Sequence, residues 1–434
     1  MTEMGARLSG PATRLRRTKK SVVLFIAAVG IFAAACTNDI VPKGGWSGPV
    51  EFDGYLYFGT GGSDGKLMRV SAESGLLDPT WQYPAGEKTN VGAIYGSPVV
   101  LNGIIHAAGY SCRGNICEGD VFAVDPETGQ AAWAEGGYSI ETKLAGQLAA
   151  GTDTIVFGTS KVGKGDSAPG YLYALDPEVD AGRGLNASVA ARRKWRIAVD
   201  GPVLGSPVVD ADIAYFGTMN RTFYAVDLTD DEDYVADPEK RILWTFQTEG
   251  AMSGVPYVRD GKVIFGDFEN RLYALSLAVR KAGYTGAPDS ARGEWVFTGE
   301  AWFWGSPVAD ATTIYASTVG GQVYALDIKS GVPKWDAAQQ VEGQVVGALV
   351  LIDSQRGAAI GIPVGKKNVA VLRASDGLLI GELFTDQPVK SAPTVSGDFV
   401  FIHTLKGQFY TFSAKSFEQR TCVETKKDGE RCES

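Results

Sequence analysis

Cysteine is the residue type in this sequence with the clearest capacity for covalent chemistry. Five cysteines occur, and four of them stand in two close pairs, Cys112 with Cys117 and Cys422 with Cys432. Such pairs can close disulfides in an oxidising compartment, each stabilising a short loop by roughly 2 to 3 kcal/mol. Zinc is the competing interpretation, but no third or fourth ligand type stands near either pair. The spacing therefore predicts two local disulfides and no metal site.

Histidine and the acidic residues offer little further chemistry. The two histidines, His106 and His403, stand in strand-like stretches, so no Ser/His/Asp arrangement can be argued. The acidic insert 230–237 invites a calcium interpretation, yet it lacks the glycine and the terminal glutamate of an EF-hand loop. We therefore assign no catalytic residue, no metal and no cofactor, and we expect a protein that binds or scaffolds.

The first 35 residues have the composition of an export signal. Five basic residues between Arg14 and Lys20 precede the apolar run 22–35, which at 14 residues is too short to span a bilayer as a helix. Small residues directly precede Cys36, and this junction resembles the lipobox of bacterial lipoproteins. The resemblance implies removal of residues 1–35 and acylation of the Cys36 thiol. An ordinary signal peptide with an incidental cysteine is the alternative.

The net charge argues against nucleic acid as a partner. The full chain carries −9, and loss of residues 1–35 removes six basic residues and Glu3, which leaves −14. A body of this charge is repelled by phosphate. We therefore expect attachment to a bacterial membrane through the lipid on Cys36. The predicted location is the periplasmic face of the outer membrane where the cell has one, and otherwise the outer face of the plasma membrane.

A repeated phrase organises the rest of the chain. Gly96-Ser97-Pro98-Val99-Val100 recurs from Gly205 and again from Gly305, and weaker copies occupy the intervals. The third residues of the copies are Pro49, Pro98, Leu148, Pro207, Pro256, Pro307, Leu349 and Pro393. This gives eight units spaced by 42 to 59 residues, a period typical of propellers.

Each unit has the pattern of four short strands. Alternating residues run between Gly and Asp turns, and the third strand often ends in a phrase such as Phe122-Ala123-Val124-Asp125. No long stretch has a helical period. The sequence therefore predicts an all-β fold, an eight-bladed β-propeller of four-stranded antiparallel blades over residues 46–417. Residues 36–45 should form a lipidated tether that reaches at most about 35 Å, and residues 418–434 a disulfide-bonded tail.

Tryptophans near the fourth strands carry a family resemblance. The phrase AVDPETGQAAW, from Ala123 to Trp133, resembles the tryptophan-docking repeat of pyrroloquinoline-quinone (PQQ) type propellers, and ALDIKSGVPKW, ending at Trp335, matches it equally well. The expected docking residues are Trp81, Trp133, Trp195, Trp244, Trp295 and Trp335. The resemblance fades in the last two units, where Gly381 takes the place of the tryptophan.

Two branches of this superfamily imply different functions. Quinoprotein dehydrogenases resemble the chain in repeat but bind PQQ and calcium with the help of adjacent cysteines, whereas four residues separate Cys112 from Cys117 here. The lipoproteins of the outer-membrane β-barrel assembly machinery, the BamB type, resemble it in lipobox, length and repeat number. This resemblance implies a scaffold, monomeric by itself, that binds a protein at or in the membrane and assists barrel assembly. A generic ligand-binding propeller and a PQQ-dependent dehydrogenase are the alternatives.

The residues just before the repeated phrases form the candidate binding surface. They should lie where the chain crosses from an outer strand to the next inner strand, near the mouth of the central funnel. The ring is largely apolar and aromatic, as the cores of binding sites are. Its predicted partner-binding members are Trp46, Tyr95, Leu204, Trp302, Phe303, Trp304 and Lys390. The alternative is that these side chains plug the funnel or pack between blades.

Overall fold

The computed structural model describes most of the predicted propeller. The described residues are 47–432, apart from 63–64, 85–90, 114–115, 134–136, 145, 161–168, 179–191, 278–283, 287–292 and 428. They belong to one compact unit, Lys43–Ser434. The expected signal peptide 1–35, the lipidation residue Cys36, the tether 36–45 and Trp46 lie outside the described residues. Among the helices that are described, none has the length and apolar character needed to cross a bilayer.

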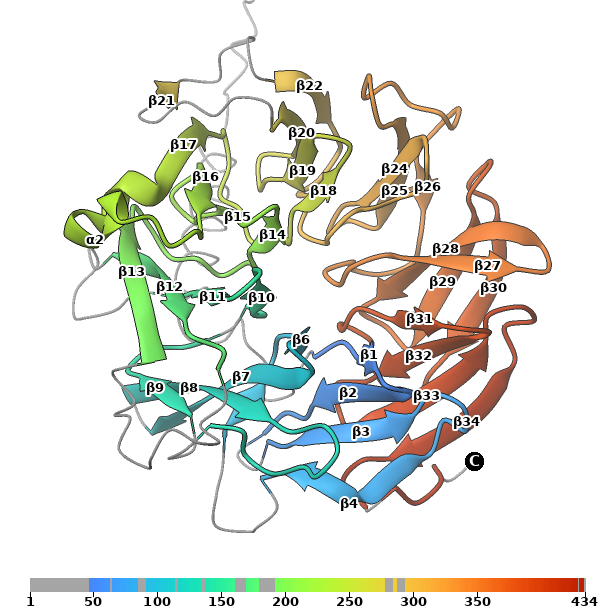
Figure 1. Ribbon diagram of the computed structural model, residues 1–434. Helices are drawn as coiled ribbons and strands as arrows, with labels where there is room; N and C mark the ends of the chain where they lie inside the picture. Colours follow the sequence, from blue (N-terminus) through green and yellow to red (C-terminus); the bar gives the residue numbers. More distant parts are fainter. Residues whose placement is uncertain are drawn as a thin grey trace, which may run out of the picture. The chain divides into compact units, whose positions relative to one another are not determined.

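Eight β-sheets follow one another along the described chain, and Figure 1 shows them arranged as blades around a common centre. The turns between first and second strands explain the antiparallel pairing in blades 2 and 5. Asn102 and Gly103, like Asp260 and Gly261, both have positive φ values of 50° to 78°. Two successive left-handed residues match the twist of a tight hairpin, and Asn-Gly and Asp-Gly sequences favour that turn. The predicted eight-bladed β-propeller is confirmed.

The four main strands of each blade are consecutive in the chain. Blades 1 and 2 consist of β1 (Val50–Phe52), β2 (Tyr55–Gly59), β3 (Leu67–Ser71) and β4 (Leu77–Tyr83), then β5 (Ala93–Ile94), β6 (Val99–Leu101), β7 (Ile104–Arg113), β8 (Ile116–Val124) and β9 (Tyr138–Ile140). Blades 3 and 4 consist of β10 (Ala149–Ala150), β11 (Ile155–Gly158), β12 (Gly170–Leu175) and β13 (Arg193–Val199), then β14 (Val208–Asp210), β15 (Ile213–Gly217), β16 (Thr222–Asp227) and β17 (Ile242–Gln247).

The second half repeats this pattern. Blades 5 and 6 consist of β18 (Tyr257–Arg259), β19 (Lys262–Gly266), β20 (Arg271–Ser276) and β22 (Gly293–Thr298), then β23 (Val308–Ala309), β24 (Thr313–Ser317), β25 (Gln322–Asp327) and β26 (Gln339–Gln340). Blades 7 and 8 consist of β27 (Val350–Ser354), β28 (Gly357–Val364), β29 (Asn368–Arg373) and β30 (Leu379–Phe384), then β31 (Thr394–Ser396), β32 (Phe399–His403), β33 (Gln408–Ser413) and β34 (Gln419–Glu424).

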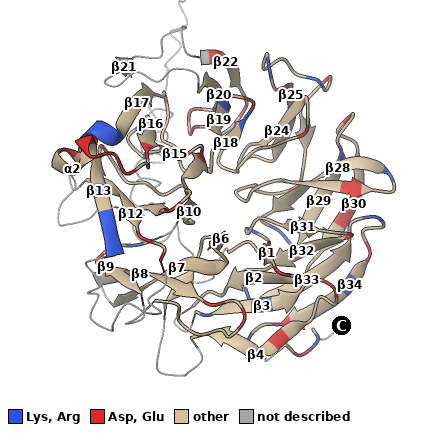
Figure 2. Ribbon diagram, viewed as in Figure 1, with Lys and Arg blue, Asp and Glu red and all other residues tan. Residues whose placement is uncertain are grey.

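Three features depart from a plain array of four strands. β5 adds to the far half of the long strand β7, and β21 (Tyr284–Gly286), from an insert in blade 5, pairs in parallel with the outer edge of β17. β34 lies beyond residue 417, so blade 8 takes its outer strand from the segment that the sequence assigned to the tail. The acidic insert 230–237 contains the short helix α2 (Asp233–Ala236), and η3 (Pro238–Arg241) follows it; Figure 2 shows acidic residues in red beside the α2 label.

The hydrophobic core lies between blades. Each neighbouring pair of blades shares one cluster of buried side chains, including the pair formed by blades 8 and 1. All six docking tryptophans belong to these clusters, with exposed fractions of 1 to 8%. The Nε1 atoms of Trp133, Trp295 and Trp335 donate to carbonyl oxygens of the following blade, at 3.1 to 3.4 Å. These tryptophans therefore join blades, because a buried indole N–H needs an acceptor.

Candidate functional site

The repeated phrases meet one another around the centre of the propeller. Each phrase directly precedes the first strand of its blade, and its leading glycine touches the backbone of the next blade. A Cβ atom at Gly205 would lie 2.7 Å from the Ser253 carbonyl oxygen, and one at Gly254 would lie 2.7 Å from that of Trp304. Gly305 has the same relation to Gly347, at 2.6 Å. Only glycine permits this approach, so the phrase specifies how closely the blades converge.

The serine of the phrase joins neighbouring blades by hydrogen bonds. The Gln147 N–H donates to Ser206 Oγ at 2.8 Å, and the Val255 N–H donates to Ser306 Oγ at 3.2 Å. Each bond satisfies a backbone donor that lies outside the strands of its blade. The glycine and the serine therefore have architectural roles, and they fix the positions of the residues that flank them.

A second set of loops lies beside these phrases. In five blades, the N–H of a residue in the turn between second and third strands donates to a carbonyl in the crossing segment that enters the same blade from the preceding one. The five donors are Met219, Phe268, Val319, Gly365 and Leu405, and their acceptors are Pro202, Ala251, Trp302, Gln344 and Pro388, at 2.7 to 3.2 Å. The turns and the crossing segments thus form one end of the propeller, which we call the crossing face.

Three aromatic rings stack on the crossing face. Phe268 lies between Trp302 and Trp304, with ring centroids 5.2 and 5.0 Å apart and interplanar angles of 19° and 29°. All three side chains are half-buried, so part of each ring faces solvent. Stacked arrangements of this kind are favourable between aromatic rings, so each ring helps to order its neighbour. The sequence predicted Trp302 and Trp304 but missed Phe268, whose turn lies more than thirty residues earlier in the chain.

A buried carboxylate fixes the turn that presents Phe268. Asp267 is fully buried, and its Oδ1 accepts the N–H groups of Glu269 and Arg271 at 2.9 Å. Its Oδ2 accepts the Gly250 N–H at 2.9 Å and the Tyr273 hydroxyl at 3.0 Å. Burial in turn raises the pKa of Tyr273, which keeps its hydroxyl a donor. Four donors to one carboxylate leave the turn little freedom.

The other predicted funnel residues that the structure describes are either half-buried or buried. Leu204 and Lys390 are half-buried, and burial lowers the pKa of the Lys390 ammonium. Phe303 is 1% exposed and packs against Tyr324 in the core between blades 5 and 6, so it is unavailable to a partner. Tyr95 is 9% exposed and stacks on Tyr110 at 5.1 Å. The side chains of Phe303 and Tyr95 therefore pack inside the propeller, as the alternative interpretation of the sequence has it.

The other chemically capable residues have structural surroundings. Burial lowers the pKa of both His106 and His403 to about 4, so each ring is neutral at pH 7. Cys112 is joined to Cys117 and Cys422 to Cys432. Over the described ranges, no three His, Cys, Asp or Glu side chains come together to hold a metal ion. In the acidic insert, Asp230 pairs with Lys194 at 2.7 Å.

Two hollows in the described part of the chain lie away from the aromatic stack. One, of about 500 Å³, is lined by turns of blades 1 and 8 that include Asp53, Glu73 and Asp398. The other, of about 410 Å³, lies between blades 1 and 2, beside Tyr55 and Arg69. The Arg69 guanidinium there stacks on Tyr55 at 4.0 Å and pairs with Asp78 at 2.7 Å, so its charge is already satisfied.

The eight blades, the repeated phrase and the docking tryptophans define a PQQ-like β-propeller repeat protein. The family model described as the outer membrane protein assembly factor BamB matches residues 117–233 and 287–385. The chain is thus a PQQ-like propeller of the BamB type. The outer membrane protein assembly factor BamB of Nitrosomonas eutropha is 26% identical over 267 residues, 60% of this chain and 54% of that protein. The chain thus spans about half the length of this relative.

Two solved structures share the fold. The computationally designed Ika8 protein superposes with a TM-score of 0.62 at 11% identity, covering 86% of this chain and 96% of its own. BamB from Moraxella catarrhalis superposes with a TM-score of 0.53 at 16% identity, covering 76% of this chain and 87% of its own. At these identities the likeness concerns the propeller alone.

Proposed function

We propose that this protein is a non-enzymatic scaffold that binds other proteins and assists the assembly of outer-membrane proteins. The match of two long segments to the BamB model carries the proposal. The relative from Nitrosomonas eutropha, named as an outer membrane protein assembly factor, supports it. In this proposal the lipid on Cys36 holds the propeller at the membrane, so its loops stay within reach of a membrane-embedded partner.

The aromatic stack on the crossing face is the proposed contact surface. Trp302, Phe268 and Trp304 offer large rings that are already ordered, so binding loses little side-chain entropy. Aromatic residues of this kind dominate the energy of protein interfaces when a partner removes their remaining solvent contact. Glu269 and Glu300 are exposed in the same loops. A protein segment that presents apolar side chains flanked by lysine or arginine would complement this surface.

Recovery of bound proteins from the native membrane tests the proposal. The acylated protein is purified in mild detergent, its partners are identified by mass spectrometry, and the eluate is examined for quinone absorbance. Near-stoichiometric recovery of a barrel-assembly protein is the expected result. Recovery of a bound quinone without such a partner would overturn the scaffold proposal in favour of a redox enzyme. Recovery of a different protein class would replace assembly by a more general binding role.

Two variants make the pull-down specific. Cys36→Ser removes the site of acylation, and we expect the protein to leave the membrane fraction while keeping its fold. Trp302→Ala removes one ring of the stack and should reduce partner recovery without moving the protein from the membrane. Phe384→Ala is the matched control, because Phe384 is 64% exposed at the end of β30 in blade 7 and takes no part in the stack of Phe268, Trp302 and Trp304. Equal recovery with both aromatic variants would exclude the stack as the contact.

A further inference from the structure

The joint between blades 8 and 1 differs from the other seven joints of the propeller. The four main strands of every blade are consecutive in the chain, so the chain itself links each blade from 1 to 7 to the next one. Blade 1 begins at β1 and blade 8 ends at β34, and no strand passes from one to the other in the described chain. This joint, which we call the seam, is therefore held by side chains alone. The inference drawn from it does not depend on the proposed function.

Buried contacts close the inner part of the seam. Phe58 of blade 1 lies against Phe409 of blade 8, with ring centroids 4.6 Å apart. His403 Nδ1 is 3.4 Å from the Ser47 carbonyl oxygen, and the Thr394 hydroxyl donates to the Pro49 carbonyl oxygen. These contacts lie near the centre, where every other joint has comparable packing in addition to its covalent bridge.

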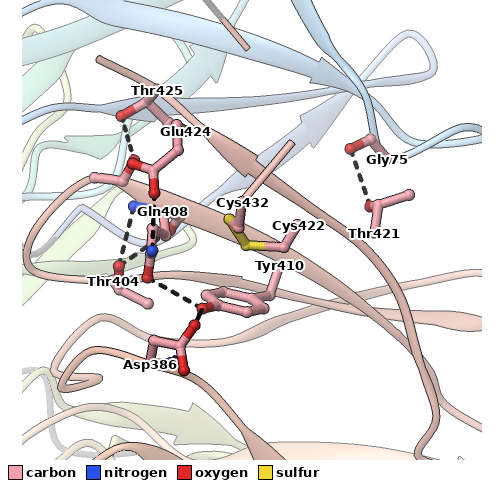
Figure 3. Close-up of a disulfide and its surroundings, with 11 residues drawn as sticks. Gly75, Asp386, Thr404, Gln408, Tyr410, Thr421, Cys422, Glu424, Thr425 and Cys432 are labelled. Atoms are coloured by element: carbon pink, nitrogen blue, oxygen red, sulfur yellow. Dashed lines mark hydrogen bonds between the residues drawn. A yellow bond between two sulfur atoms is a disulfide. The ribbon is translucent and has the colours of Figure 1, made fainter. Parts of the chain in front are cut away.

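The outer part of the seam lacks the usual tryptophan. At the register position of Trp195 and Trp295, blade 8 has Thr421, which pairs opposite Thr411. Its hydroxyl donates to the Gly75 carbonyl oxygen of blade 1 at 3.2 Å (Figure 3). A threonine buries far less apolar surface than an indole, so this outer contact is weaker than its counterparts.

A disulfide-bonded hairpin lies where the tryptophan is missing. After β34 the chain turns back along the outer edge of the same strand, with Arg431 opposite Val423 and the Cys432 N–H donating to the Cys422 carbonyl oxygen at 3.1 Å. The Cys422–Cys432 bond locks this return, as Figure 3 shows. The turn reaches blade 1, where a Cβ atom at Gly429 would lie 2.9 Å from Leu77 Cβ.

The hairpin contacts both neighbours of blade 8. Cys422 belongs to the buried cluster between blades 7 and 8, whereas the next residue, Val423, belongs to the cluster between blades 8 and 1. Leu77, against which the turn packs, is a member of the same seam cluster and is 8% exposed. Release of the hairpin would uncover Leu77 and the edge of Val423.

We propose that the Cys422–Cys432 hairpin is a redox-sensitive clasp that keeps the propeller closed at the seam. While the disulfide is intact, the turn stays on Leu77 and blade 1 cannot separate from blade 8. When the disulfide is reduced, the hairpin loosens and the seam opens more often. Dithiothreitol supplies the two electrons and two protons: its thiols become a cyclic disulfide while the S–S bond of the clasp becomes two thiols.

Hydrogen exchange of the folded protein, with and without dithiothreitol, tests the clasp. Cys112→Ser/Cys117→Ser retains only the clasp disulfide, and Cys422→Ser/Cys432→Ser retains only the hairpin disulfide of blade 2. In the first variant we expect reduction to speed exchange in β3 and β4 of blade 1 by about ten-fold or more, while β19 and β20 of blade 5 keep their rates. The second variant should exchange fast in blade 1 with or without reductant.

The part of the chain in which reduction speeds hydrogen exchange decides whether the proposal holds. Faster exchange confined to residues 419–432, with blade 1 protected as before, would show that the disulfide stabilises only its own hairpin and would overturn the clasp. Faster exchange in every blade would show a global loss of stability and would equally contradict it. If the serine variants of the clasp fail to fold, reduction of the folded first variant still gives the answer.

Discussion

The ring of Phe417 fills the space that Gly381 leaves open between blades 7 and 8. A Cβ atom at Gly381 would lie 2.4 Å from Phe417 Cδ2. At the joint between blades 5 and 6 the roles are reversed, because Trp295 of the outer strand packs on Gly331 of the following turn. Phe417 even keeps the left-handed backbone that the glycine normally has, with φ at 67°. In the joint between blades 7 and 8, the small residue thus stands on the outer strand and the large residue on the turn of the following blade, and the contact between them is kept.

This exchange predicts a coupled pair of substitutions. Phe417→Gly alone should lower the free energy of unfolding by about 3 to 5 kcal/mol, because it leaves a cavity. Gly381→Trp alone should also destabilise, since the indole would meet the Phe417 ring. The double variant rebuilds the usual tryptophan-on-glycine joint and should recover much of both losses. Urea unfolding of the four proteins measures the coupling, and additive losses would exclude the exchange.

Gly254 gives a prediction about the ring of repeated phrases. Gly254→Ala places a methyl group 2.7 Å from the Trp304 carbonyl oxygen, so we expect a loss of about 1 to 3 kcal/mol in the free energy of unfolding. Gly365→Ala is the matched control, because its methyl group would lie 3.2 Å from the nearest atom, the Gln344 carbonyl oxygen. Thermal or urea unfolding compares the two. A loss no larger at Gly254 than at Gly365 would contradict the close approach.

The buried histidines predict a loss of stability in mild acid. Burial lowers the pKa of His403 to about 4, whereas the unfolded side chain titrates near 6.5. As pH falls from 6.5 towards 4, the unfolded state binds the proton first, so the free energy of unfolding decreases. One such histidine gives a loss of about 2 kcal/mol between pH 7.5 and pH 5.

Substitution of each histidine isolates its part of this loss. His403→Phe keeps an aromatic ring against Phe58, whose centroid lies 4.7 Å from that of His403, and it removes the titrating group. Urea unfolding at pH 7.5 and pH 5 should then show a smaller difference than in the wild type. His106→Phe should remove a similar share, since the pKa of His106 is also lowered to about 4. Unchanged pH dependence in both variants would refute the assignment.

The aromatic stack predicts a local loss of binding. Phe268→Ala removes the central ring and should weaken the partner's affinity by about ten-fold or more, the effect expected of a residue at the centre of an interface. Circular dichroism should remain that of the wild type, because the Asp267 carboxylate still fixes the turn. Titration of the partner identified by pull-down measures the affinity. Wild-type affinity in this variant would place the contact elsewhere.

Local signals in the sequence were enough to predict the propeller. The pairs Asn102-Gly103 and Asp260-Gly261 mark hairpins because few other residues accept two left-handed conformations in succession. The repeated phrase marks the start of each blade because its glycine meets a neighbouring backbone. Both requirements act on single positions, so each leaves a visible trace in the sequence. The outer strand of blade 8 was misplaced because Cys422 suggested a tail rather than a strand.

The binding surface was less predictable because it joins distant segments. Phe268 meets Trp302 and Trp304 through two different loops, and nothing near Phe268 in the sequence indicates that contact. Phe303 was wrongly placed with its neighbours, because consecutive residues of an extended segment face opposite ways. The side chains of Trp302 and Trp304 stack on Phe268, and the side chain of Phe303, which lies between them in the sequence, points into the core. The alternation of residues 302 to 304 could have been inferred from the sequence, whereas the contact of Trp302 and Trp304 with Phe268 could not.

The contiguous blades fix the order in which the molecule can be completed. Contacts within a blade join residues close in sequence, which form quickly because little chain entropy is lost. A chain delivered amino end first can therefore finish each sheet soon after its fourth strand arrives. The seam is different, since its hydrogen bonds join residues 345, 346 and 356 positions apart. Until the last strand is delivered, blade 1 keeps an uncovered apolar flank, and that is the period in which the unfinished protein is most exposed to aggregation.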